Sequence, residues 1–295
     1  MLTIASLTFK EALRKKILLA AVVLTLLFLV LYGTGLHFMA NDLEEMREHQ
    51  SNSRGGGFSA VETELMIEQS KRMFLLLGIY FSSSIVSLLA IFSSVGSVSA
   101  EIENGMLHAI MAKPIRRRDI ILGKFIGYAL MLSFYAAILF ISILALNHYI
   151  AGAKVPREPG AVALFILQPL VLLAFTIAGS TRFSTLANGI TAFMLYTIGV
   201  IGGMIEWVGV TMKNSVLSNT GIVTSLLMPV DSIYRMIVGL ISDSSGNLMS
   251  LMGVDPLGPF GTASRPSIAM LIYTFIYLVA FIAIAVRSFS RRDIA

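Results

Sequence analysis

Long apolar runs separated by polar segments dominate the pattern of hydrophobic and polar positions along this chain. Six of the runs are long enough to cross the hydrocarbon core of a bilayer, which takes roughly 20 apolar residues in a helix. Charged residues and histidines are absent from the middle of every run, and Glu206 comes closest, beside Trp207 at the end of the fifth. The pattern predicts an all-α membrane protein whose six spans cover residues 17–38, 73–96, 125–147, 160–181, 187–208 and 267–287.

Two polar segments have the amphipathic pattern of a helix. Residues 1–16 carry apolar side chains such as Phe9 on one face and basic ones such as Lys10 elsewhere, which is typical of a helix lying in the membrane interface. In the segment 97–124, apolar residues recur at helical spacing before Pro114. That proline ends the predicted helix, because the residue before a proline avoids helical backbone angles.

The distribution of charge predicts how the chain is oriented. Only 13% of the residues are charged and the mean hydropathy is +0.82, whereas a soluble domain carries about 25% charged residues. Residues 1–16, 97–124, 182–186 and 287–295 hold thirteen of the 22 lysines and arginines, while the remaining segments hold twelve of the seventeen acids. Because loops rich in Lys and Arg stay on the cytoplasmic side, both termini are predicted to be cytoplasmic (N-in, C-in).

The segment 209–266 is then external and is more than a simple loop. It contains "GIVTSLLMPV" and "DSIYRMIVGLIS", two apolar pieces of ten to twelve residues. Pieces of that length are too short to cross a bilayer, so they are predicted to form re-entrant or interfacial helices.

Motifs for catalysis and for nucleotide or metal binding are missing. Gly123-Lys124 looks like the end of a phosphate-binding loop, but Arg118 occupies the upstream glycine position and Phe125 replaces the final Ser or Thr. There is no cysteine, no H-E-x-x-H and no G-x-S-x-G. We therefore predict no catalytic residue, no metal site and no cofactor in this chain. The basic residues are interpreted as membrane-orienting rather than as nucleic-acid-binding groups.

The absence of ionisable groups deep in the spans also bears on the energy source. Carriers driven by protons or ions commonly use such groups as relays. A transporter without them takes its energy from a partner. A passive channel or secondary carrier, and a membrane scaffold that transports nothing, stay open as alternatives.

Small residues in the second and fifth predicted spans permit two interpretations. Such residues let membrane helices approach closely. In one interpretation they line a transport pathway or a subunit interface, and in the other they serve ordinary packing within the chain. The residues are Ser83, Ser87 and Ser94 in the second span, and Gly199 and Gly203, at G-x-x-x-G spacing, in the fifth.

Three stretches resemble a known family, and the shortest of them is the C-terminal "FSRRDI" at residues 289–294. "SAEIENGMLHAIMAKPIRRRDIILGKF" is similar to the cytoplasmic signature of ABC-type export permeases of the second (type-2) class, except that Met106 stands where the family usually has threonine. "LLMPVDSIYRM" resembles an external segment of the subgroup associated with copper-enzyme maturation, matching at Pro229, Asp231 and Arg235. The positions that match the cytoplasmic signature are Glu101, Glu103, Gly105, Pro114, Arg117, Gly123 and Lys124.

The resemblance implies a single permease domain over residues 1–295 in a prokaryotic plasma membrane. It also implies that two permease chains, the same or homologous, pair and bind two copies of a separate ATP-binding subunit, which carries the ATP and Mg. The cytoplasmic helix would dock on that subunit, with its acids pairing basic groups there. The predicted coupling residues are Glu101, Glu103, Gly105, Met106, Ile110, Pro114 and Arg116, and the predicted membrane-surface anchors are Arg116, Arg117, Arg118 and Lys124.

Overall fold

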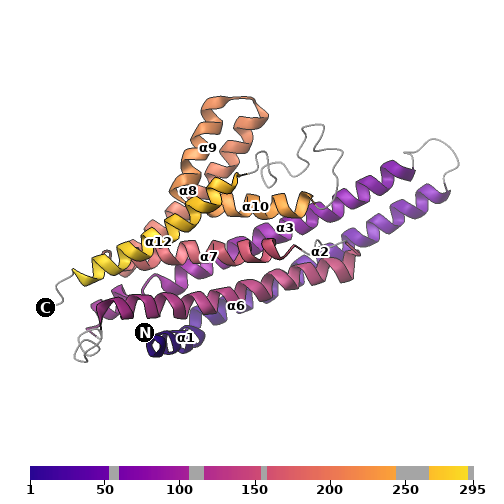
Figure 1. Ribbon diagram of the computed structural model, residues 1–295. Coiled ribbons are helices and arrows are strands. Elements are labelled where there is room, and N and C mark those ends of the chain that lie inside the picture. The colour runs from indigo at the N-terminus through magenta and orange to yellow at the C-terminus, as the bar shows by residue number, and fades with distance from the viewer. Residues whose placement is uncertain (53–59, 106–115, 154–157, 244–265, 292–295) are drawn as a thin grey trace.

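The structure, a computed structural model, describes residues 1–52, 60–105, 116–153, 158–243 and 266–291. Every regular element within these ranges is a helix. Most of the long helices lie side by side in an elongated bundle, and the two termini lie at the same end of it (Figure 1). A contact between distant parts of the chain agrees with this placement, because Arg117 Nη1 donates a hydrogen bond to the backbone oxygen of Ser290 at 3.3 Å.

Six helices in the described part of the chain are long and apolar enough to cross a membrane. This confirms the prediction of an all-α chain with six long apolar helices. The six are α2 (Lys16–Asn52), α3 (Ala60–Ser94), α6 (Arg117–Ala151), α7 (Pro159–Ser180), α8 (Thr185–Thr211) and α12 (Ile268–Ser290).

Helices α2 and α3 continue well past the predicted spans 17–38 and 73–96. Their 37 and 35 residues correspond to about 55 and about 50 Å of helix, more than the roughly 30 Å hydrocarbon core. The polar sequence beyond each apolar run contains no glycine or proline within these helices, so nothing in it stops the helix. The two extensions form an arm beyond the bundle (Figure 1).

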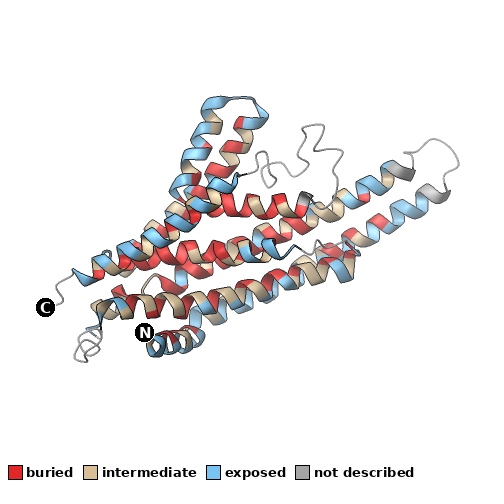
Figure 2. Cartoon of the chain, viewed as in Figure 1, coloured by how far each residue is buried: buried red, intermediate tan, exposed pale blue. Residues whose placement is uncertain are grey.

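Helix α7 lies at the centre of the bundle, in contact with α3, α6, α8, α12 and α10 (Val230–Asp243). In the most apolar stretch of α7, 67% of the residues are buried, against 6% in α2. Buried positions gather on the inner helices in Figure 2, and exposed positions lie on the outer ones. The outer apolar residues are suited to lipid, so low burial of α2 is compatible with a span.

A short helix, α1 (Leu2–Arg14), is present where the amphipathic pattern predicts one. The face that packs against α6 carries the small residues Ala5, Thr8 and Ala12. The larger apolar residues Leu2 and Leu13 are exposed. The larger apolar side chains are thus left for lipid, and a position of α1 in the membrane interface stays a prediction.

Helices also form at the two short apolar pieces of the segment 209–266. They are α9 (Ser215–Leu227) and α10, which meet at an angle of 106°. Pro229 stands at this bend; it has no backbone N–H to donate into the preceding turn. The pair is either a broken span or a re-entrant loop, and α9 lies along the end of α8 (Figure 1).

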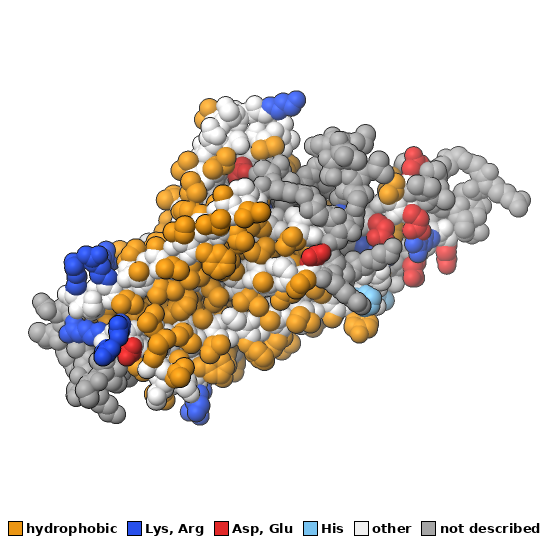
Figure 3. All heavy atoms as spheres, in the orientation of Figure 1, with side chains coloured by type: hydrophobic (Ala, Val, Ile, Leu, Met, Phe, Trp, Pro, Cys, Tyr) orange, Lys and Arg blue, Asp and Glu red, His pale blue; other side chains and the backbone are white. Residues whose placement is uncertain are grey.

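Basic and acidic side chains gather at opposite ends of the molecule. Figure 3 shows Lys and Arg side chains near the end that holds the termini, Asp and Glu side chains around the α2–α3 arm, and a hydrophobic belt between them. The arm also contains an ion pair, in which Arg47 and Glu64 approach to 2.7 Å. The basic end is therefore the side that the distribution of loop charge assigns to the cytoplasm.

This polarity predicts the outcome of cysteine labelling, which is direct because the natural chain has no cysteine. In intact cells, an impermeant thiol reagent should label a cysteine introduced at the exposed position Glu44 on the arm. A cysteine at Ser290 should react only after the membrane is permeabilised. Labelling of Ser290 in intact cells would show that the basic end faces outward.

Candidate functional site

The signature stretch forms a corner between α3 and α6 at the basic end. After α3, the chain turns into α4 (Ser99–Glu103), a single short helix that ends at Asn104. Gly105 follows with φ +67°, a left-handed conformation that glycine adopts without strain and that commonly ends helices. Residues 106–115, with the predicted coupling residues Met106, Ile110 and Pro114, lie outside the described ranges.

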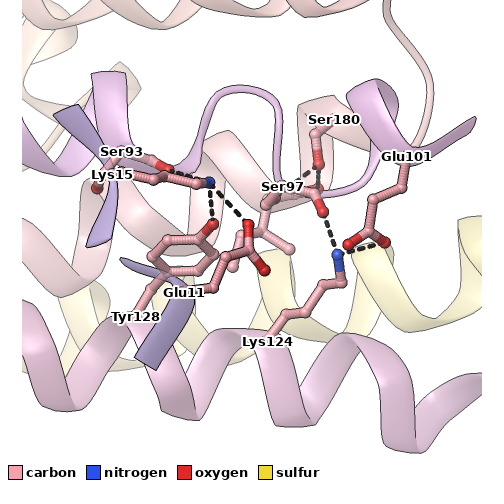
Figure 4. A network of polar contacts seen from close by, with 9 residues as sticks. Glu11, Lys15, Ser93, Ser97, Glu101, Lys124, Tyr128 and Ser180 are labelled. Atoms are coloured by element: carbon pink, nitrogen blue, oxygen red, sulfur yellow. Dashed lines mark hydrogen bonds and ion pairs between the residues drawn. The ribbon is translucent and has the colours of Figure 1, made fainter. Parts of the chain in front are cut away.

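A buried ion pair fixes this corner to α6. Lys124 Nζ lies 2.5 Å from Glu101 Oε2, and the same ammonium group donates to the backbone oxygen of Ser97 (Figure 4). Lys124 is only 6% exposed. Because a buried charge is costly unless it is paired and hydrogen-bonded, these two partners hold the lysine and join α4 to α6.

The second acid of α4 reaches a different helix. The Glu103 carboxylate accepts hydrogen bonds from the backbone N–H of Thr185 at 3.0 Å and from its hydroxyl at 3.1 Å. Thr185 is the first residue of α8, where free backbone N–H groups and the helix dipole favour a negative charge. The hydroxyls of Ser99 and Thr185 also lie 2.8 Å apart, so α4 and the start of α8 are held by three polar contacts.

Helix α1 joins the same region through Lys15. Its ammonium group donates to the Tyr128 hydroxyl of α6 at 2.6 Å and lies 3.4 Å from Glu11 Oε1 (Figure 4). Burial lowers the pKa of Lys15, but Tyr128 and Glu11 outweigh that effect and raise the pKa above its ordinary value. The lysine is therefore a cation that ties the N-terminal helix to α6.

A second polar cluster lies near the far end of α8. One nitrogen of Arg235, Nη2, is 2.7 Å from Glu206 Oε2 and 2.7 Å from Asp231 Oδ2, and it also donates to the Ser225 hydroxyl at 3.4 Å. Arg235 is 5% exposed and Glu206 is 6% exposed. The contacts bring together α8, α9 and α10, so the arginine fastens the bent helix pair to the fifth span.

The charged side chains of both clusters serve to join helices to one another. Within the described ranges, no three His, Cys, Asp or Glu side chains are grouped so that they could hold a metal ion. The carboxylates of Glu101, Glu103, Glu206 and Asp231 are each engaged by a basic side chain or a helix start. What the arrangement can do is transmit displacement between helices that share a buried charge.

One family model, described as ABC-2 family transporter protein, matches residues 2–294. The chain belongs to this family. A search of the curated proteins finds no match. Membership agrees with the six long apolar helices in indicating a multi-pass membrane protein and a transporter subunit rather than an enzyme. Members of the ABC-2 family normally work with an ATP-binding subunit.

The structure of this ABC-2 protein corrects the prediction for Lys124. It was expected to anchor the membrane surface, but its side chain is buried and paired with Glu101. The reason is that α6 begins at Arg117, two turns before the predicted span, so Lys124 falls within the helix and faces α4. Arg116 and Arg118 are exposed and Arg117 is partly exposed, and their role as anchors stays a prediction.

Glu101 and Glu103 also differ from expectation, because both carboxylates are used within the chain. They were expected to pair with basic groups on a partner, but α4 packs onto α6 and α8 instead of standing free. Glu103 is still exposed at the surface. Of the two carboxylates, that of Glu103 is therefore the more accessible.

Four of the five small residues contact other segments of the same chain, and the fifth, Ser94, hydrogen-bonds within its own helix. Gln168 of α7 donates to the hydroxyls of Ser83 and Ser87, and the Ser94 hydroxyl donates to the Ala90 oxygen at 2.6 Å. A side chain added at Gly199 would meet the backbone oxygen of Met228 at 3.1 Å, and one at Gly203 would collide with the Asp231 carboxylate. These contacts are the ones that ordinary packing within the chain requires.

Sequence reasoning missed the link between Glu206 and Arg235. In the sequence, Glu206 stands at the outer edge of a predicted span, and Asp231 stands where an N-cap would begin the second apolar piece. Arg235 is singled out only by the resemblance. A signal was available, since Asp231 and Arg235 are spaced i, i+4 on an apolar helix. Their neighbour across the bend could not be read from spacing, because it depends on how α10 folds back toward α8.

The buried cluster predicts a large difference between two arginine substitutions. Arg235→Gln leaves two buried carboxylates without their cation, and breaking a buried pair costs about 3–5 kcal/mol. Arg47→Gln removes one partner of an exposed pair on the arm, with an expected cost of at most about 1 kcal/mol. The free energy of unfolding of each purified variant in detergent measures the contrast. Equal stabilities for Arg235→Gln and the wild type would contradict the structural role of the cluster.

Proposed function

We propose that this ABC-2 protein is the permease subunit of an ATP-driven exporter and that the α4 corner receives the motion of a separate ATP-binding subunit. The observation that carries the proposal is the set of polar contacts joining α4 to two spans, Glu101 to Lys124 of α6 and Glu103 to Thr185 of α8. A force applied to a free loop would be dissipated. A force applied to α4 acts on both helices.

The surroundings of the corner support docking of a protein from the basic side. Arg116 and Arg118 are exposed beside it, and Glu103 offers a carboxylate at the surface. The basic end is the cytoplasmic side by the distribution of loop charge, which is where ATP is available. In the proposed assembly, two permease chains, the same or homologous, act with two ATP-binding subunits, and ATP and Mg are bound by the partners.

The chemical class of the transported compound is inferred only from the resemblance to a family subgroup. Pro229, Asp231 and Arg235 match the subgroup associated with copper-enzyme maturation, which would favour a sulfur- or metal-related compound. The proposal therefore includes such a compound as the cargo, export as the direction of transport, and a prokaryotic plasma membrane as the location.

Charge exchange across the buried pair tests the coupling role. Glu101→Lys and Lys124→Glu each place two like charges together, which should displace α4. Under mild detergent, each variant should recover at least about tenfold less ATP-binding subunit than the wild type, because breaking a buried pair costs about 3–5 kcal/mol and displaces the helix proposed to receive the partner. The double exchange, Glu101→Lys with Lys124→Glu, restores opposite charges and should recover most of the complex and of its ATP hydrolysis.

A matched control uses the exposed pair on the arm. Glu64→Lys also creates a like-charge pair, with Arg47, but at the opposite end and in water, where pairs contribute little. It should copurify its partner as the wild type does. Recovery of a normal complex from the single α4 variants would refute the coupling role. A wild-type chain that brings down no ATP-binding subunit, or that sustains transport in vesicles without one, would favour a scaffold or a passive carrier.

A further inference from the structure

An open pocket of about 470 Å³ lies between the turn that joins α7 to α8 and the last turns of α12. Three of its side chains are arginines that come from both segments. Arg287 lies in the last turn of α12 and Arg291 directly follows the end of that helix. Arg182 belongs to the α7–α8 turn, where its Nε donates to the Ser288 hydroxyl at 3.1 Å. The lining residues are Thr181, Arg182, Ile284, Arg287, Ser288 and Arg291.

The three arginines differ from the basic residues that the fold uses internally. Lys15, Lys124 and Arg235 each have a carboxylate within salt-bridge distance. No carboxylate of the described residues lies within that distance of Arg182, Arg287 or Arg291, all of which are exposed. Among the described residues, the three exposed guanidinium groups therefore make a pocket of one sign of charge, which attracts an anion.

Apolar surface adjoins these cations. Ile284 in the pocket is 41% exposed, and Phe183, next to Arg182, is 48% exposed. Farther along α12, Ile276 and Val279 are more than half exposed. In Figure 3, basic side chains lie where the hydrophobic belt ends. A ligand at this place would meet cations at one end and an apolar helix face at the other.

We propose that the pocket binds the phosphate headgroup of an anionic phospholipid from the leaflet on the basic side, with an acyl chain along the exposed face of α12. Guanidinium groups match phosphate oxygens in bidentate geometry, and basic pockets between membrane helices favour anionic headgroups. The volume lies in the range of ordinary ligand pockets. A lipid held there would join the α7–α8 turn to the end of α12, in addition to the hydrogen bond from Arg182 to Ser288.

The test is a titration of the full chain in mild detergent with phosphatidylglycerol, phosphatidylcholine or inorganic phosphate, read by native mass spectrometry and by the unfolding temperature. Phosphatidylglycerol should bind saturably and raise the unfolding temperature, whereas phosphatidylcholine and inorganic phosphate should not. The variant Arg287→Gln with Arg291→Gln should bind phosphatidylglycerol about 30-fold more weakly, because each basic residue near an anionic surface contributes a factor of about five. Its unfolding temperature without lipid should equal that of the wild type.

The matched control removes two exposed charges from the same end of the molecule, with Lys10→Gln and Arg14→Gln on α1. It should retain most of the affinity for phosphatidylglycerol. If the control lost as much affinity for phosphatidylglycerol as the pocket variant, the binding would reflect general attraction between the basic end and anionic lipid, and the proposal would be overturned. An equal shift with inorganic phosphate would also overturn it, because the ligand would then be a soluble anion. A pocket variant that binds lipid normally but loses its ATP-binding subunit would assign the arginines to a protein contact instead.

Discussion

A bilayer offers no water to a charged side chain, and this constraint explains where the few buried charges of the protein are found. Each one that the structure describes in detail is paired between helices. Lys124 meets Glu101, and Arg235 meets Glu206 and Asp231. Removing one partner would strand the other in a medium that cannot solvate it. The pairs therefore fix which helices stay together, in a fold whose apolar surfaces gain little by leaving lipid for one another.

Close packing between helices adds to the contacts made by the buried charges. Gly123 and Gly127 of α6 lie against α1, and a side chain at either position would collide with Ile4 or with Thr8. The N-terminal helix can approach α6 only because these two positions are glycine. That approach in turn brings Lys15 to Tyr128. Gly123, which in the sequence looks like part of a nucleotide motif, thus has a steric role beside Lys124.

The sequence was sufficient for the features that depend on long runs of residues. Six apolar stretches predict six long helices, and two shorter pieces predict the helices on either side of Pro229, because these properties are local. It was insufficient wherever the identity of a neighbour decides the role. Lys124 reads as a surface cation because arginines precede it, and its burial follows from the early start of α6. Glu206 reads as an edge residue until α10 places Arg235 beside it.

Helix α8 connects the two polar clusters directly. Its first residue, Thr185, is held by Glu103 of the corner, and Glu206, near its other end, is held by Arg235 of α10. The 21 residue steps from Thr185 to Glu206 correspond to about 32 Å of helix. On either side of Glu206 along α8, Gly202 and Gly209 lie against α9 without room for a larger side chain, so α8 and α9 are in close contact near this end. A displacement of α4 along α8 would reach the bent pair α9–α10 through contacts that are all polar or steric, with no loop in between. What the proposed function requires in addition is that α8 has two arrangements, one for each state of the ATP-binding partner.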